Sequence, residues 1–332
     1  MPPLAPPPRS DSQLAVAWRA MDGSNAKAKT IAEVPIARHP EFYFSDGSVV
    51  IIVERTAFRV HQSVLARHSD VFNDMWDVPQ PNRSETYDGC PMVVLSDSVM
   101  DFVDVMRVIY DAFHFDKLKS DTNLSTLITF VAGILRISTK YSMQQLRNKC
   151  IAIIQAKFPS TLKGCDEVLS RGIQYVPSEI VRIIPLARET TVPKVLPWAF
   201  YLCAHISVDE ILTNSVLSWR DKALCLAGKE RLWEAQKKYT HPFLLDFKQC
   251  PQCTGACQTR VPRMLKIENI ENLRMSPHPL EEYTDWKSLM LCPKCQSVSE
   301  MGHRDGRERV WDALPSFFHL GTWEDICKDQ NC

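Results

Sequence analysis

Residues 58–76 read FRVHQSVLARHSDVFNDMW, and this stretch decides the fold. The segment AFRV at 57–60 is rich in aromatic and β-branched residues, which predicts a short strand. The segment QSVLARHS at 62–69 predicts a helix instead, and Ser69 is placed to cap a second helix over DVFNDMW. His61 stands where the strand ends and the helix begins. An imidazole there can hydrogen-bond the exposed backbone groups and stack on the core, so we assign His61 a structural role.

The composition is that of an ordinary globular protein. The chain has 332 residues, of which 45% are hydrophobic and 23% are charged, enough for about two domains. Lys and Arg together number 39, as do Asp and Glu. Because the net charge is zero, we expect no nucleic acid partner. The longest apolar stretches, at 127–137 and 198–208, are too short to span a bilayer, so no membrane partner is expected.

The N-terminal residues predict a disordered arm over 1–38. They begin MPPLAPPPRSDSQ, which is rich in proline and lacks the apolar core of a signal peptide. The chain also has twelve cysteines. Without an export signal these indicate a reducing compartment, and hence thiols or metal ligands rather than disulfides. We therefore expect a cytoplasmic or nuclear protein, or one found in both compartments.

Strands come first and helices follow in residues 39–158, which predicts an α+β domain. The β-branched run VVIIV at 49–53, then AFRV, then PMVVLSD at 91–97 are the expected strands. Apolar residues then recur at helical spacing in three stripes. These stripes start at Val99, Leu124 and Leu146.

The remainder of the chain divides into two further regions. Residues 159–248 are helical by pattern, with helices expected at 178–190, at 194–206 and, with an interruption, at 208–239. Residues 249–332 differ, because seven of the twelve cysteines lie there. This last region is predicted to be a small cysteine-rich unit that binds zinc.

Residues 39–158 resemble a BTB/POZ domain. That family has a short strand, an acidic turn and a second strand, then Phe-x-Val-His, a Ser-x-x-Leu helix and Ser-x-x-Phe-x-x-Met. The matching positions in this sequence are Asp46, Phe58, Val60, His61, Val64, Leu65, Ser69, Phe72 and Met75. The resemblance implies a short mixed sheet capped by helices. A domain of this kind with a cysteine-paired tail is also similar to BTB-containing proteins abundant in mushroom-forming fungi.

The resemblance implies a module for protein–protein interaction that forms a homodimer and recruits other proteins. The aromatic first strand, with Phe42 and Phe44 on one side, is the expected interface. Two more specific roles stay open: a substrate adaptor that binds a cullin scaffold of a ubiquitin ligase, and a nuclear transcriptional scaffold. Adaptors of the family often carry a hydrophobic-x-Glu element in the loop that matches residues 110–123. That loop, YDAFHFDKLKSDTN, has Asp but no Glu.

Two C-P-x-C units carry the strongest chemical signal. CPQC at 250–253 and CPKC at 292–295 each place two thiolates on a tight turn whose backbone proline fixes in advance. Four thiolates suit zinc in a tetrahedral site and, less often, an iron–sulfur cluster. The predicted ligands are Cys250, Cys253, Cys292 and Cys295. Cys257 is an alternative ligand, His278 or His303 could replace a cysteine, and Trp286 and Leu289 could supply a small core.

No sequence motif supports an enzyme. The sequence has neither G-x-G-x-x-G nor G-x-x-x-x-G-K-[ST], and HRDGRE at 303–308 matches a kinase catalytic loop in only three letters. A catalytic metal needs an open coordination position, whereas four thiolates would close the site. We therefore expect a protein without enzymatic activity, and a metal-dependent enzyme is the less favoured alternative.

Overall fold

The computed structural model describes residues 35–78, 85–119, 121–253, 257 and 267–328. The predicted disordered arm lies outside the described residues up to position 34. The chain divides into two compact units, which are described separately. The sheet unit comprises residues up to 62 together with 80–99, and the helical unit comprises 63–79 together with everything after 99.

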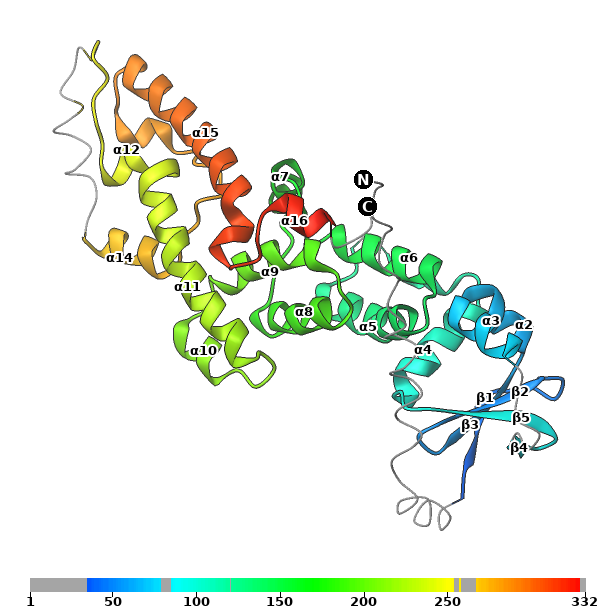
Figure 1. The fold of residues 1–332 in the computed structure, drawn as a ribbon. Coiled ribbons are helices and arrows are strands. Elements are labelled where there is room, and N and C mark those ends of the chain that lie inside the picture. Colours follow the sequence, from blue (N-terminus) through cyan, green and yellow to red (C-terminus); the bar gives the residue numbers. More distant parts are fainter. Residues whose placement is uncertain (1–34, 79–84, 120, 254–256, 258–266, 329–332) are drawn as a thin grey trace, which may run out of the picture. The chain divides into compact units, whose positions relative to one another are not determined.

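The sheet unit is a five-stranded mixed sheet in the order β1-β3-β2-β5-β4 (Figure 1). The central strand β2 pairs antiparallel with β3 and parallel with β5, and β1 pairs parallel with β3. Every residue of β2 is buried, as its unbroken apolar run predicts. The strands are β1 (Ala37–Tyr43), β2 (Val49–Val53), β3 (Thr56–Val60), β4 (Thr86–Tyr87) and β5 (Cys90–Leu95). All three predicted strands are confirmed, and β1 begins inside the segment predicted as an arm.

A tight turn connects β4 to β5 and reaches back to the edge strand β1. Asp88 and Gly89 have φ values of 47° and 74°, the left-handed conformation that Asp-Gly favours in two-residue hairpins. The Asp88 carboxylate accepts hydrogen bonds from the Tyr43 hydroxyl and, at 2.6 Å, from the Arg38 guanidinium. Burial and this carboxylate raise the pKa of Tyr43 to about 12. The turn therefore joins two parts of the sheet unit that are distant in sequence.

His61 packs against Phe44 in a tilted arrangement, while the hydrogen bond predicted for it at the helix start is accepted by Ser48. The His61 ring lies 5.3 Å from the ring of Phe44, and its Nε2 is 3.4 Å from a carboxylate oxygen of Asp46. The first amide of the helix, that of Gln62, donates to the Ser48 hydroxyl at 3.0 Å. A serine oxygen can reach an amide at a helix start in the usual capping geometry.

Five helices begin the helical unit, and Ser69 organises the first part of it. Its hydroxyl accepts the Phe72 amide at 3.0 Å, which confirms the predicted cap, and donates to the Tyr141 carbonyl at 2.5 Å. Ser69 thereby joins two segments more than 70 residues apart in sequence. The helices are α2 (Gln62–His68), α3 (Asp70–Asp77), α4 (Val99–Tyr110), α5 (Leu124–Lys140) and α6 (Gln144–Gln155). Helices α5 and α6 pack side by side (Figure 1).

The middle of the helical unit follows the predicted pattern with one addition. The predicted helix at 208–239 is interrupted, as expected, and Ser218 caps its second part by accepting the Asp221 amide at 3.1 Å. The additional helix is α7, which is short and buries only two residues, so its apolar pattern is weak. The helices are α7 (Leu162–Ser170), α8 (Pro177–Glu189), η3 (Pro193–Val195), α9 (Leu196–Cys203), α10 (Val208–Thr213) and α11 (Trp219–Ala235).

The last part contains a 25-residue helix, α15 (Pro293–Phe317), that the sequence pattern did not predict. It lies along α11 and the π-helix η4 (Gln236–Thr240) (Figure 1). Near its C-terminal end, the ring centroid of Trp311 lies 6.2 Å from that of Trp198 in α9. The other elements here are α12 (Pro242–Leu245), α14 (Ile267–Met275), η5 (Trp286–Leu289) and α16 (Trp323–Lys328). Among the described helices, none combines the length and apolar character needed to cross a bilayer.

A glycine allows α15 to approach η4 closely. A Cβ atom built on Gly306 would lie 2.1 Å from the carbonyl oxygen of Tyr239, which is backbone and cannot swing aside. Gly302, one turn earlier on the same helix, has no heavy atom within 4 Å of the equivalent position. The two glycines therefore differ in surroundings while sharing a helix.

We expect Gly306→Ala to lower the free energy of unfolding by about 2 kcal/mol or more, because the methyl group forces the two backbones apart. Gly302→Ala is the matched control. It should raise that free energy by about 0.5–1 kcal/mol, because alanine favours a helix. Urea unfolding followed by circular dichroism measures both, and equal effects of the two substitutions would contradict the close approach.

Candidate functional site

The first cysteine pair lies in a turn that follows α12. The amide of Cys253 donates to the carbonyl of Cys250 at 3.0 Å, which closes the turn around Pro251. Proline fixes φ near the value such a turn needs. The two thiols are half-buried and lie close to the core beneath them.

The second pair lies at the start of α15. Cys292 is the N-cap residue and Pro293 occupies the first helical position, where a missing amide hydrogen costs nothing. The amide of Cys295 donates to the Cys292 sulfur and lowers the pKa of Cys292 to about 6. Burial instead raises the pKa of the Cys295 thiol. A thiolate at a helix N-terminus is a good metal ligand, because only the thiolate binds metal.

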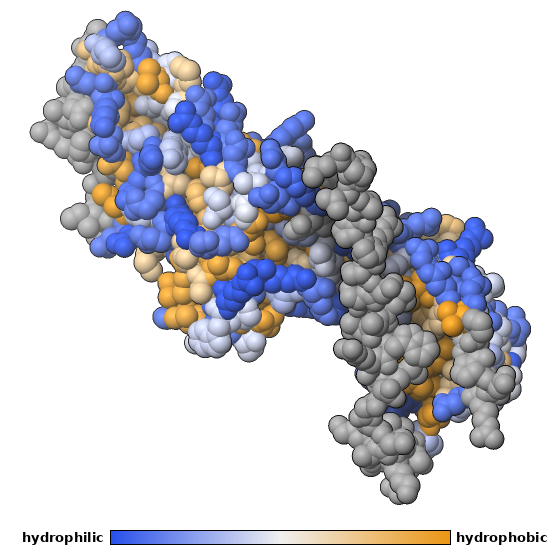
Figure 2. Space-filling model, in the orientation of Figure 1, coloured by the Kyte–Doolittle hydropathy of each residue, from blue (hydrophilic) through white to orange (hydrophobic). Residues whose placement is uncertain are grey.

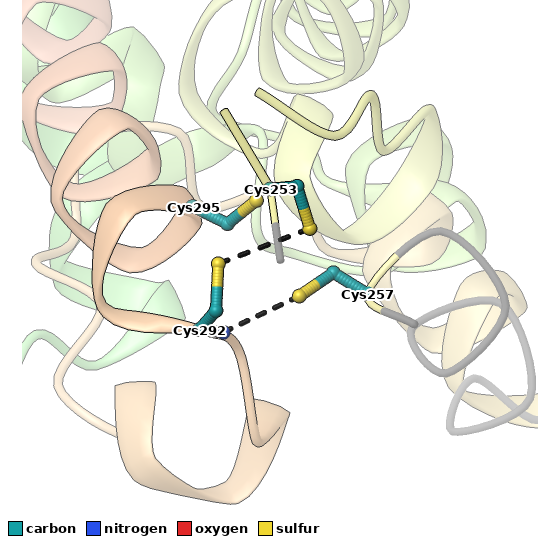
Figure 3. A group of neighbouring side chains, drawn as sticks. All are labelled: Cys253, Cys257, Cys292 and Cys295. Carbon is teal, nitrogen blue, oxygen red and sulfur yellow. Dashed lines mark hydrogen bonds between the residues drawn. The ribbon is translucent and has the colours of Figure 1, made fainter. Parts of the chain in front are cut away.

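The sulfur atoms of four cysteines all lie within 4.8 Å of one another (Figure 3). The Cys253 and Cys292 sulfurs are 3.9 Å apart, and the Cys292 amide donates to the Cys257 sulfur at 3.3 Å. A tetrahedral site with Zn–S bonds of about 2.3 Å has sulfur–sulfur edges of about 3.8 Å. The cysteine cluster, defined as Cys253, Cys257, Cys292 and Cys295, can therefore hold a metal ion.

Cys250 lies next to this cluster. Its sulfur is 3.5 Å from the Cys295 sulfur, to which its amide also donates at 3.4 Å. Three of the four predicted ligands thus belong to the cluster, and the fourth lies beside it. The predicted alternative, Cys257, belongs to the cluster itself. The spacing C-x2-C-x3-C over 250–257 is the sequence signal that placed Cys257 among the candidates.

The two candidate histidines do not join the cluster. His303 donates from Nδ1 to the Thr240 carbonyl at 2.7 Å and accepts the Tyr283 amide at Nε2 at 3.1 Å. Both of its ring nitrogens are therefore engaged by backbone groups. His278 lies 2.9 Å from Glu281 through Nδ1 and 2.9 Å from the Ser276 hydroxyl through Nε2. Neither histidine therefore lies among the cysteine sulfurs that approach one another in this structure.

A small aromatic core supports the cysteine cluster. Leu289 is buried and Trp286 packs against the same core, which confirms the prediction for both residues. Phe243 lies at its centre, with ring-centroid distances of 4.5 Å to Trp286 and 5.0 Å to Tyr283. Two of the five fully buried members of this core are cysteines of the cluster, Cys257 and Cys295. The core thus buries few apolar side chains, and it depends on the cysteine sulfurs staying close together.

The sequence did not single out two enclosed histidines: His241 is buried against Phe243, and His205 is half-buried with its Nε2 atom enclosed. Burial lowers the pKa of His205 and of His241 to about 3 in each case. His278, Glu281 and Lys229 are the ionisable groups that act on His205. His205 donates from Nδ1 to the Tyr201 carbonyl at 2.8 Å, while its buried Nε2 has no hydrogen-bond partner among the described residues. Both imidazoles are therefore neutral in the folded chain near pH 7.

We expect the helical unit to lose stability as the pH falls from about 7 to about 4.5. A histidine has a pKa of about 6.5 when unfolded, so the unfolded state binds more protons in this range. The stability is fully present above the unfolded pKa and is lost toward the folded pKa of about 3. Each histidine adds a slope of about 1.4 kcal/mol per pH unit within this range. Glu281, whose pKa is lowered by its contact with His278, acts in the same direction.

Urea unfolding at a series of pH values measures this slope. His205→Asn keeps a donor for the Tyr201 carbonyl but cannot titrate. The dependence of the unfolding free energy on pH should therefore fall by about 1.4 kcal/mol per pH unit, the contribution of one proton. An unchanged slope in His205→Asn would contradict the assignment.

Of the predicted interface residues, Phe42 lies on the edge strand β1 and Phe44 directly follows that strand. Phe42 is 3% exposed, and its ring stacks on that of His39, which in turn stacks on Phe58. Phe42 therefore contributes to the core of its own sheet. Phe44 is half-buried and packs on His61. Of the pair, Phe44 offers more surface to a second chain.

Two exposed apolar features stand out in the helical unit. Phe113 is 73% exposed and immediately precedes η2 (His114–Lys117), within the loop at 110–123. Apolar side chains also gather around α10, where Figure 2 shows apolar residues on the visible face. We call this second feature the α10 patch, and it consists of Val208, Leu212, Val216 and Trp219. Lys222 lies 4.4 Å from the centre of the Trp219 ring and holds it in place. Exposed apolar side chains that gather in one region are typical of protein contact sites.

The fold and these surfaces agree with a comparison to known families. Residues 44–158 match the model of the BTB/POZ domain. No curated protein matches the chain. The chain therefore contains a BTB/POZ domain, and a further helical region and a cysteine cluster follow that domain. The similarity to fungal proteins stays a prediction.

Proposed function

We propose that this protein is a non-enzymatic interaction module whose BTB/POZ domain forms a homodimer and recruits other proteins. The match of residues 44–158 to the BTB/POZ family carries the proposal, because domains of this family are generally interaction modules. Phe113 and the α10 patch support it by offering apolar contact surface outside the sheet unit. A cytoplasmic or nuclear location belongs to the proposal.

Self-association is tested by sedimentation equilibrium on the full chain. We expect a mass of two chains of 37.9 kDa each at micromolar concentration. Phe44→Ser, directly after the edge strand β1, should shift the equilibrium toward the monomer, because it removes apolar contact surface. Val94→Ser is the control, since Val94 is 65% exposed on β5 of the same sheet. An unaltered chain that stays monomeric at about 100 µM, corresponding to a Kd weaker than the usual range of specific dimers, contradicts the homodimer.

A substrate adaptor of a cullin-type ubiquitin ligase is the second candidate. Phe113 favours it, because this exposed aromatic lies in the loop where adaptors of the family carry their hydrophobic-x-Glu element. Asp116 offers a carboxylate three residues later in place of the missing Glu. An exposed aromatic side chain of this kind can act as the central contact of an interface.

Titration calorimetry of the full chain against the N-terminal region of a cullin scaffold tests this role. We expect micromolar or tighter binding, and a loss of at least about tenfold in Phe113→Ala. Val176→Ala, at an exposed apolar residue on another element, should bind like the unaltered chain. Absence of heat with the unaltered chain would remove the adaptor role and leave the homodimeric module.

We further propose that the cysteine cluster holds a structural zinc ion. Its donor set of thiolates suits zinc, and the 3.9 Å between the Cys253 and Cys292 sulfurs matches the edge of about 3.8 Å in a tetrahedral site. A bound ion would stabilise the thin aromatic core by holding the two cysteine turns together. Zinc uptake by the unaltered full chain tests this proposal and is the first measurement of the experiment described below.

A further inference from the structure

Five cysteine thiols, rather than four, gather at the cysteine cluster. The sulfur of Cys250 lies 3.5 Å from that of Cys295, and the Cys250 amide donates to the same sulfur at 3.4 Å. A tetrahedral ion takes only four ligands. The site therefore contains one thiol more than such an ion needs.

Cys250 and Cys257 compete for the fourth ligand position. Cys253 lies between them in sequence, and it belongs to either set of four together with Cys292 and Cys295. The 3.5 Å contact of Cys250 is close to the tetrahedral edge of about 3.8 Å. Cys257 lies within 4.8 Å of all three shared sulfurs. Cys257 is thus close to all three shared sulfurs, and Cys250 is in contact with one of them, that of Cys295.

We propose that Cys250 and Cys257 are alternative fourth ligands of one ion whose other ligands are Cys253, Cys292 and Cys295. This inference rests on the zinc site proposed above. In the exchange, one metal–sulfur bond forms to the incoming sulfur and one breaks to the outgoing sulfur. The proton that the incoming thiol loses passes to the outgoing thiolate. The charge of the site is unchanged, and no oxidant or reductant is needed.

Backbone hydrogen bonds keep the displaced thiol close to the ion. When Cys250 coordinates, the Cys257 sulfur still accepts the Cys292 amide, at 3.3 Å in this structure. When Cys257 coordinates, the Cys250 amide still donates to the Cys295 sulfur and holds Cys250 beside it. Both states therefore keep the spare thiol in the cluster, ready to return.

The experiment measures zinc uptake and affinity of the full chain by competition with a chromophoric chelator. The unaltered chain should take up one ion. Cys250→Ser and Cys257→Ser should each keep one ion with an affinity lowered by about twofold, the loss expected when one of two equally populated states is removed. The affinity for zinc should fall by at least about 100-fold in the double variant and in Cys253→Ser. Loss of a group that only hydrogen-bonds a metal ligand already lowers affinity by about 10–100-fold. Cys327→Ser, outside the cluster, should match the unaltered chain.

Each outcome decides between the proposals. If the zinc affinity of only one of Cys250→Ser and Cys257→Ser falls as far as that of Cys253→Ser, the fourth ligand is fixed and the exchange is wrong. If the double variant binds like the unaltered chain, neither thiol is the fourth ligand and the exchange is equally wrong. An unaltered chain that takes up no zinc overturns the zinc site itself. Circular dichroism of every variant separates a lost ligand from a lost fold.

Alkylation of the zinc-loaded chain gives a readout that does not depend on binding constants. N-ethylmaleimide should modify about one of the five thiols, because a four-coordinate ion protects the other four. Tandem mass spectrometry should find this modification divided between Cys250 and Cys257. Modification confined to one of these positions contradicts the exchange, and modification of all five thiols contradicts the zinc site.

Discussion

The close approach of α15 to η4 is the constraint on which the C-terminal half of the helical unit depends. Only a residue without a side chain fits at Gly306, where the Tyr239 carbonyl would meet a Cβ atom at 2.1 Å. The helix that this contact positions carries Cys292 and Cys295 at its start. Its other end stacks Phe318 on Phe200 of α9 at 5.3 Å. One backbone contact therefore sets the position of the cysteine cluster relative to the aromatic core around α9.

The two ends of α15 are stabilised by different physical means. Around Trp311 and Phe318 the helix packs against large aromatic side chains, and burial of apolar surface suffices. Around Cys295 the buried core is small and consists partly of sulfur atoms. Covalent or coordinate bonds commonly replace apolar burial where a core is this small. This difference explains why the cysteine thiols gather at one end of α15 and the aromatic side chains at the other.

The parts of the fold that depend on local chemistry could be predicted from the sequence. Strand β2 follows from VVIIV, the cap of α3 follows from Ser69, and the C-P-x-C turns follow from proline between paired thiols. Helix α15 could not be predicted, because its buried face includes His303, Gly306 and Arg307. These residues carry no apolar periodicity, and their partners lie far away in sequence. Arg307, for example, donates to the Leu280 carbonyl and pairs with Asp166. Likewise, no local pattern identifies His205 or His241 as buried.

The all-apolar strand β2 leaves its own alignment undetermined. Sliding it by one residue would exchange one apolar face for the other, so no polar side chain of β2 would report the error. The information that fixes the alignment must therefore come from its neighbours. Arg59 of β3, which faces Val50, donates from Nε to the Gly47 carbonyl at 3.0 Å, and a Cβ on Gly47 would lie 2.8 Å from the Arg59 side chain. Arg59 and Gly47, which lies just before β2, thus fix the register of a strand whose own side chains do not distinguish one alignment from the next.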